Sequence, residues 1–286
     1  QGVWKQWTLT IFPMYHTRNL IGNMWNNYLG GLRDVTRYAD AFRYQTEEMK
    51  TFADELGRTW THEELTKGMT ELGVVNRGFM ASELPRLFEQ ELESAFPGFK
   101  DLKDPGKIMS LMLGDRNLML RMGGKFGRAL ENNARIALYL DGLGKGMSEL
   151  EAAMRVKKYL FDYSDLTIFE RNVLRRFFPF YSWSRFNIPL QFEHLITRPG
   201  LFVSAIKAKG AVESDVPPAP DESLLPKWMK DEAPVRIRKN EDSTFSYLLL
   251  GGWLPAADLL KAMDLPSLAG GLMTPIVKAP WEFFAN

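Results

Sequence analysis

Apolar residues recur at helical spacing along most of the chain up to residue 200. Between Pro13 and Gly30, apolar side chains four residues apart predict a helix over about 17–29. A second stripe, with spacings of four and three residues, predicts one helix from Val35 to Leu56 that packs on a neighbouring element. The members of this stripe are Tyr38, Phe42, Gln45, Met49, Phe52 and Leu56.

Three Ser/Thr-x-x-Glu patterns mark helix starts. In such a capping box the hydroxyl accepts a hydrogen bond from an early backbone N–H, while the glutamate reaches back to the cap residue. The three pairs are Thr61 and Glu64, Ser148 and Glu151, and Thr167 and Glu170. The third predicts a helix that ends before Pro179, because proline disfavours a helical residue ahead of it. A further helix is expected from Pro189 to Thr197, stopped by Pro199.

More helices are expected over residues 82–95, after the Asp104-Pro105 start signal, and around residues 126–138. On the last of these, Glu131 and Arg135 stand four residues apart and predict a surface ion pair, worth only about 0.2–0.5 kcal/mol.

The composition changes after residue 212. Residues 213–234 form a Pro- and acid-rich linker, and alternating apolar residues around the polar turn 239–243 predict a β-hairpin. The fold class is therefore mainly α, an elongated assembly of several helices with a small β-hairpin near residues 235–250. The expected organisation is an Asn/Gly/aromatic segment (1–35), a helical region (36–212), the linker (213–234), and the hairpin followed by short apolar helices (235–286).

Composition and charge narrow the function classes. The 286 residues suffice for one or two domains, and 36 Lys and Arg against 35 Asp and Glu give no global attraction to polyanions. The absence of cysteine excludes disulfides and thiolate metal sites. The most apolar tract, residues 243–257, is shorter than the ~20 residues of a membrane helix. Because the chain begins with Gln1, we expect it to be a piece of a longer protein.

No pattern of catalytic residues is found. His16, His62 and His194 are each isolated, so none is expected to bind a metal or to catalyse a reaction. The glycine-rich pieces at 123–128 and 142–148 lack the spacing of a phosphate-binding loop and are explained by helix ends and turns. We therefore expect no catalytic residue, no cofactor and no metal site, and we expect that the protein is not an enzyme.

The most distinctive stretch is an aromatic–Arg segment, which we define as residues 168–189. Large rings bury on the order of 150–250 Å² each, and guanidinium groups stack on their faces. The candidate interaction residues are Arg171, Arg175, Arg176, Phe177, Phe178, Phe180, Tyr181, Trp183, Arg185 and Phe186. Three interpretations stay open: an aromatic joint between two helices, a surface for another chain, or a contact with nucleic acid or membrane.

This segment lies in residues 162–191, DYSDLTIFERNVLRRFFPFYSWSRFNIPLQ, which resemble part of very large tailed-bacteriophage proteins of the internal virion, ejection or tape-measure class, often called large polyvalent proteins. Residues 12–31 and 272–286 resemble the same group in the same order. The matching motifs are not enzymatic, so no catalytic residue carries over.

The resemblance implies a structural component of a phage virion, located in the head interior or tail lumen and delivered with the genome or guiding it during ejection. Its expected partners are other virion proteins (portal, tail tube or tail tip) and copies of itself, with transient contact to DNA or the host envelope. The alternative is a peripheral membrane or nucleic-acid-binding module that uses the aromatic–Arg segment.

Overall fold

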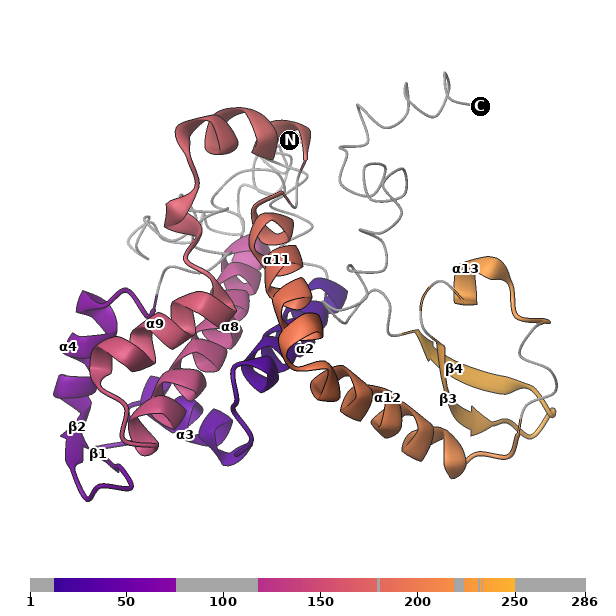
Figure 1. Cartoon of the computed structure of the whole chain (residues 1–286), viewed down its shortest axis with the longest axis horizontal. Coiled ribbons are helices and arrows are strands. Elements are labelled where there is room, and N and C mark those ends of the chain that lie inside the picture. The colour runs from indigo at the N-terminus through magenta and orange to yellow at the C-terminus, as the bar shows by residue number, and fades with distance from the viewer. Residues whose placement is uncertain are drawn as a thin grey trace, which may run out of the picture. The chain divides into compact units, whose positions relative to one another are not determined.

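The structure is a computed structural model that describes residues 13–75, 118–178, 181–218, 224–230, 232 and 234–249. Over these residues the chain is mainly α-helical with two small antiparallel two-stranded sheets, as Figure 1 shows, so the predicted fold class is confirmed. The chain divides into two units, Gln1–Ser182 and Trp183–Asn286. The helices expected over 82–95 and after Asp104, and those after residue 250, lie outside the described residues.

The first unit is built around one long helix, α8 (Leu118–Gly144). It packs against α2 (Pro13–Leu29), α3 (Thr36–Gln45) and α9 (Glu149–Leu160), and α2 confirms the helix predicted after Pro13. Every residue of α8 from position 134 to 144 is buried. The second half of α8 is therefore enclosed on all sides and forms the centre of the core.

The core of the first unit is mostly apolar, although it also encloses Arg135 and Asp141. Its α8 and α9 side chains include Ala134, Ile136, Leu138, Leu140, Leu143, Ala152, Ala153, Val156 and Leu160. Gly142 allows α8 and α9 to approach, because a Cβ atom at this position would lie 2.9 Å from the Cβ of Ala152. Both helices use small residues at this crossing, so their backbones come close together.

The long helix predicted from Val35 to Leu56 is wrong in its second half. Helix α3 ends at Gln45, and the chain then forms β1 (Thr51–Ala53), which pairs with β2 (Thr59–Thr61). Glu47 has a positive φ of 58°, a conformation that breaks a helix. Met49 and Phe52 are buried from a loop and a strand, so the apolar spacing was real but the helical interpretation was not.

All three predicted capping boxes are present, and two of them start α-helices. Thr61 caps α4 (His62–Glu71) and Ser148 caps α9, each with the reciprocal glutamate contact. Thr167 and Glu170 exchange the same two hydrogen bonds, but the chain then continues as a π-helical turn (Glu170–Leu174) and the short α10 (Arg175–Phe177).

In the second unit, two prolines act differently from the prediction. Helix α11 (Tyr181–Thr197) already begins before Pro189, which lies inside it. Pro199 does not stop the chain but occupies the first turn of α12 (Pro199–Ser214), where its missing N–H would have no intrahelical partner. A short helix, α13 (Lys227–Lys230), follows within the region expected to be a linker.

The predicted hairpin is confirmed as β3 (Pro234–Lys239) paired antiparallel with β4 (Phe245–Leu249). The pairing shifts register between Arg236 and Arg238. Helix α12 packs on β3, and Glu213 accepts a hydrogen bond from the backbone N–H of Arg236 at 3.0 Å. This contact satisfies one backbone donor of β3 with a side chain of α12.

Candidate functional site

The turn that follows the third capping box exposes large apolar side chains. Ile168 is 77% exposed, Phe169 61% and Phe177 50%, so these three do not form the interior of an aromatic joint. We call them the exposed trio. They flank the π-helical turn, a type of structure that is rare and frequently lies at functional sites.

Polar contacts hold this turn in place. The carboxylate of Glu170 accepts the backbone N–H of Thr167 (2.8 Å) on one oxygen and the hydroxyl of Tyr181 (2.8 Å) on the other. The guanidinium of Arg171 donates to the carbonyl of Leu166 from Nε (3.2 Å) and Nη2 (2.7 Å), and to the carbonyl of Ser164 (3.2 Å). Two of the candidate interaction residues, Arg171 and Tyr181, therefore contribute to the local structure.

The other candidate residues are not gathered into one cluster by any described contact. Arg175, Phe178, Trp183 and Phe186 are half-buried. Arg185 is exposed, and its guanidinium carbon lies 5.4 Å from the ring centroid of Phe186. The side chain of Arg176 and all of Phe180 lie outside the described residues.

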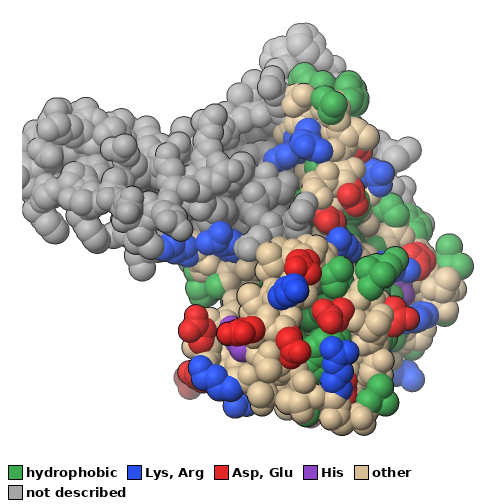
Figure 2. Space-filling view, turned by 90° about the vertical axis from the view of Figure 1, so that its left-hand side faces the viewer, with side chains coloured by type: hydrophobic (Ala, Val, Ile, Leu, Met, Phe, Trp, Pro, Cys, Tyr) green, Lys and Arg blue, Asp and Glu red, His purple; other side chains and the backbone are tan. Residues whose placement is uncertain are grey.

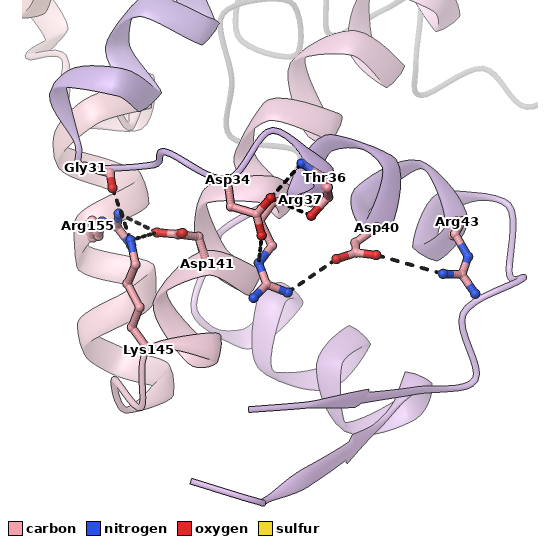
Figure 3. A network of polar contacts seen from close by, with 9 residues as sticks. All are labelled: Gly31, Asp34, Thr36, Arg37, Asp40, Arg43, Asp141, Lys145 and Arg155. Carbon is pink, nitrogen blue, oxygen red and sulfur yellow. Dashed lines mark hydrogen bonds and ion pairs between the residues drawn. The ribbon is translucent and has the colours of Figure 1, made fainter. Parts of the chain in front are cut away.

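A second group of polar residues, drawn in Figure 3, joins distant parts of the first unit. The buried carboxylate of Asp141 pairs with Lys145 Nζ (2.8 Å) and with Arg155 Nη2 (2.7 Å). The same two cations bind the turn after α2: Lys145 donates to the carbonyl of Gly31 (3.1 Å), and Arg155 Nε donates to the carbonyl of Gly30 (2.9 Å). This clasp ties α2, α8 and α9 together.

An adjoining chain of charges runs along α3. Arg37 contacts Asp34 (3.6 Å) and Asp40 (3.3 Å), and Asp40 lies 4.0 Å from Arg43, as Figure 3 shows. Hydrogen bonds from the hydroxyl and the backbone N–H of Thr36 lower the pKa of the Asp34 carboxyl. Arg37 and Asp40 are half-buried, whereas Asp34 and Arg43 are exposed, and ion pairs with an exposed partner contribute little to stability. These ion pairs link residues of α3 and the turn that precedes it.

The predicted surface pair of Glu131 and Arg135 is wrong in its location. Both side chains are buried, because α2, α3 and α9 enclose α8 on all sides. The guanidinium of Arg135 donates to the backbone carbonyls of Val74, Leu160 and Phe161. Burial lowers the pKa of Arg135, and the negative charge of Glu131 opposes that shift. Arg135 thus satisfies the carbonyls at the C-terminal end of α9, where a cation is favourable.

The histidines take structural positions where the contacts are known. His62 stacks on Tyr44 at a centroid distance of 4.5 Å, and its Nδ1 lies 3.1 Å from the carbonyl oxygen of Met49. His16 packs edge-on against Phe126. Among the described residues, no three His, Asp or Glu side chains are grouped closely enough to bind a metal ion.

The surface drawn in Figure 2 carries acidic and basic side chains interspersed, rather than gathered by sign. That distribution does not favour a track for a nucleic-acid backbone on this face, since such tracks concentrate positive charge. None of the described helices has the length and apolar character needed to cross a membrane. No protein-family model, no curated protein and no solved structure matches the chain.

The sequence identified the aromatic–Arg segment, but not which of its residues hold the turn in place and which are exposed. The sequence pattern did contain the capping box of Thr167, which fixes Glu170. The backbone carbonyls that accept hydrogen bonds from Arg135, Lys145 and Arg155 gave no signal, because they are distant from these side chains in the sequence.

Proposed function

We propose that the chain is a structural component of a phage virion, an internal ejection or tape-measure protein that accompanies or guides the genome during ejection. The observation that carries the proposal is the exposed trio, Ile168, Phe169 and Phe177, on a turn that Glu170 and Arg171 hold in place. Solvent-exposed apolar side chains on an ordered support are typical of contact surfaces for other proteins.

The resemblance of residues 162–191 to large phage virion proteins indicates what kind of assembly this surface joins. The partners are other virion proteins, such as the portal, the tail tube or the tail tip, and further copies of the chain. The location is the head interior or the tail lumen, with contact to the host envelope during infection. We propose no catalytic step, because none of the described side-chain contacts forms an acid–base pair, a nucleophile or a metal site of recognisable geometry.

The proposal is tested in particles of a phage that carries this sequence. We expect the chain, or the longer protein that contains it, to co-purify with intact virions in several copies and to appear inside the head or tail by cryo-electron microscopy. We expect the triple variant Ile168→Ser, Phe169→Ser and Phe177→Ser to be incorporated much less. Its matched control is Val35→Ser, which replaces another apolar residue that is 70% exposed.

Two outcomes would contradict the proposal separately. Purified virions without the chain would refute the virion assignment. Normal incorporation of the triple variant would refute the role of the exposed trio while leaving that assignment in place.

The alternative is a peripheral membrane or nucleic-acid-binding module, and the hydrogen bonds of Arg171 to two carbonyls count against that arginine as a phosphate ligand. The full chain would then bind DNA with a strong salt dependence, or bind anionic vesicles. Alanine at Arg175, Arg176 and Arg185 would weaken that binding.

A further inference from the structure

The backbone at the C-terminal end of α9 has an unusual conformation. Phe161, which directly follows the last helical residue, has a φ of 59° and a ψ of 146°. Helices often end on a left-handed residue, but that residue is usually glycine and its ψ is about +47°. For a residue with a bulky side chain, the conformation of Phe161 costs a factor of about 5–150 in equilibrium. The surrounding structure must therefore hold this residue in its strained conformation.

A buried side chain binds the two peptide groups on either side of the strained residue. Arg135, which is 0% exposed, donates from Nη2 to the carbonyls of Leu160 and Phe161. Its Nη1 donates to the carbonyl of Val74, beyond the end of α4, at 3.4 Å. The φ and ψ angles of Phe161 set the relative orientation of its two flanking peptide groups. Because one nitrogen binds both carbonyls, those angles cannot relax without breaking contacts with Arg135.

The same two carbonyls have a second possible set of hydrogen bonds. If Phe161 adopted right-handed helical angles, α9 would continue for another turn. Its last two carbonyls would then accept from the N–H groups four residues ahead, those of Ser164 and Asp165. In the structure Asp162 binds both of these N–H groups, through its carboxylate (3.0 Å) and its backbone carbonyl (3.3 Å). The turn therefore has two hydrogen-bonded arrangements, one strained and one relaxed.

This turn leads into the part of the chain that carries the exposed trio. Residues 166–181 are bonded to one another: Arg171 Nη2 donates to the carbonyl of Leu166 (2.7 Å), and the hydroxyl of Tyr181 donates to Glu170 (2.8 Å). Neither contact involves Phe161. A change of the backbone at Phe161 would therefore move the trio together with the contacts that support it.

We propose that Arg135 and Phe161 form a latch that sets the position of the exposed trio. In the latched state, which the structure shows, Arg135 holds Phe161 in its strained conformation. In the released state Phe161 relaxes, α9 gains about one turn, and residues 166–178 move as one piece. Burial of Phe161, Tyr163 and Leu166 favours the latched state, whereas the strain opposes it. The two states are therefore closer in free energy than an unstrained turn would make them.

The latch regulates the surface on which the proposed function depends, so its role in assembly rests on that proposal. The latch itself is a property of the isolated chain. Every measurement below uses the full 286-residue chain without virions. A latch found in a chain that virions lack would refute only the virion assignment, and a chain found in virions but without a latch would refute only this inference.

Two substitutions at residue 161 test the strain. Phe161→Gly and Phe161→Ala both remove the ring, so they differ in the backbone conformations that they allow. By native-state hydrogen exchange, we expect the opening equilibrium constant of α8 and α9 to be about fivefold lower with glycine than with alanine. The matched control compares Met154→Gly with Met154→Ala, at an exposed position inside α9. There alanine should be the more stable by about four- to fivefold.

The same two variants test whether Arg135 imposes the strain. In an Arg135→Met background the turn is free to relax, so the advantage of glycine over alanine at residue 161 should disappear. If that advantage persisted, other contacts would impose the strain and the latch would be refuted. Arg135→Lys keeps the cation but not the guanidinium geometry, and it replaces Arg135→Met in this comparison if the methionine variant does not fold.

A distance measurement tests the movement. The chain has no cysteine, so spin labels can be attached at Met154→Cys in α9 and Asn172→Cys beside the exposed trio, both at exposed positions. We expect one dominant distance in the latched chain. Adding Arg135→Met should raise the population of a second distance about tenfold or more, with the helix content retained by circular dichroism. A single unchanged distance in that variant, or a glycine variant at residue 161 no more stable than the alanine variant, would overturn the proposal.

Discussion

The buried guanidinium of Arg135 offers the sharpest test of how the first unit is held together. We expect Arg135→Met to lower the free energy of unfolding by about 3 kcal/mol. Methionine fills most of the same apolar volume, but it leaves the carbonyls of Val74, Leu160 and Phe161 without this donor. Removing one partner from a buried charged interaction costs about 3–5 kcal/mol. The lower end applies here, because the change also relieves the cost of burying the charge, the same burial that lowers the pKa of Arg135.

Urea unfolding followed by circular dichroism measures the loss. For a unit of this size it corresponds to a fall of about 6–12 °C in the melting temperature. Because the chain has two units, hydrogen exchange of the α8 and α9 amides should be followed as well, so that opening of the first unit is seen separately. The matched control is Lys125→Met, an exposed cation of the same helix, with an expected change within about 0.5 kcal/mol. If Arg135→Met proved as stable as that control, the assigned role of the guanidinium would be wrong.

Gly142→Ala should destabilise the chain by about 1–3 kcal/mol in the same urea assay, because its Cβ would lie 2.9 Å from the Cβ and 3.3 Å from the Cα of Ala152. Adding Ala152→Gly should recover part of this loss of stability. If it did not, the clash would lie elsewhere. Hydrogen bonds from the backbone N–H and then the hydroxyl of Ser148 lower the pKa of Glu151 below its ordinary 4.5. The capping box therefore contributes stability above pH 4.5 and loses it as the pH falls through the lower folded pKa. In Ser148→Ala, carboxyl-carbon NMR should show the pKa of Glu151 returning only partway to its ordinary value, because the backbone donor remains. An unchanged pKa would argue against the hydroxyl contact. The buried hydroxyl of Tyr139 has no hydrogen-bond partner among the described residues. Tyr139→Phe should therefore raise the free energy of unfolding by up to about 1 kcal/mol. A clear loss of stability would reveal a partner for the hydroxyl.

Local chemistry was readable from the sequence wherever the interacting groups lie within a few positions of one another. The capping contacts of Thr61 and Ser148 depend on a glutamate three residues away, and both were predicted correctly. The hairpin of β3 and β4 followed from alternation about a polar turn. Periodicity was misleading at Phe52. This residue lies at helical spacing from earlier apolar residues, but it belongs to the three-residue strand β1 and is buried from there.

Features that depend on which surfaces meet were not readable. Whether Arg135 faces solvent is decided by the helices that surround α8, and its own neighbours in the sequence are those of an ordinary amphipathic surface pair. The burial of Asn187 and Gln191 in α11 is another case, since nothing near them in the sequence indicates it. Within the aromatic–Arg segment, the sequence indicated the residue types of a contact surface but not that Ile168 and Phe169 would be the most exposed of its described large apolar side chains.

The clasp at Asp141 also constrains how the chain can fold as it is made. The carbonyl of Gly30 can accept its hydrogen bond only after Arg155 has been synthesised, and Arg155 lies 125 residues further along the chain. At a synthesis rate of about 5–20 residues per second, α2 emerges roughly 6–25 s before the residues that secure it. During most of that interval α2 has neither α8 nor α9 to cover it, so its apolar side chains remain exposed on the nascent chain.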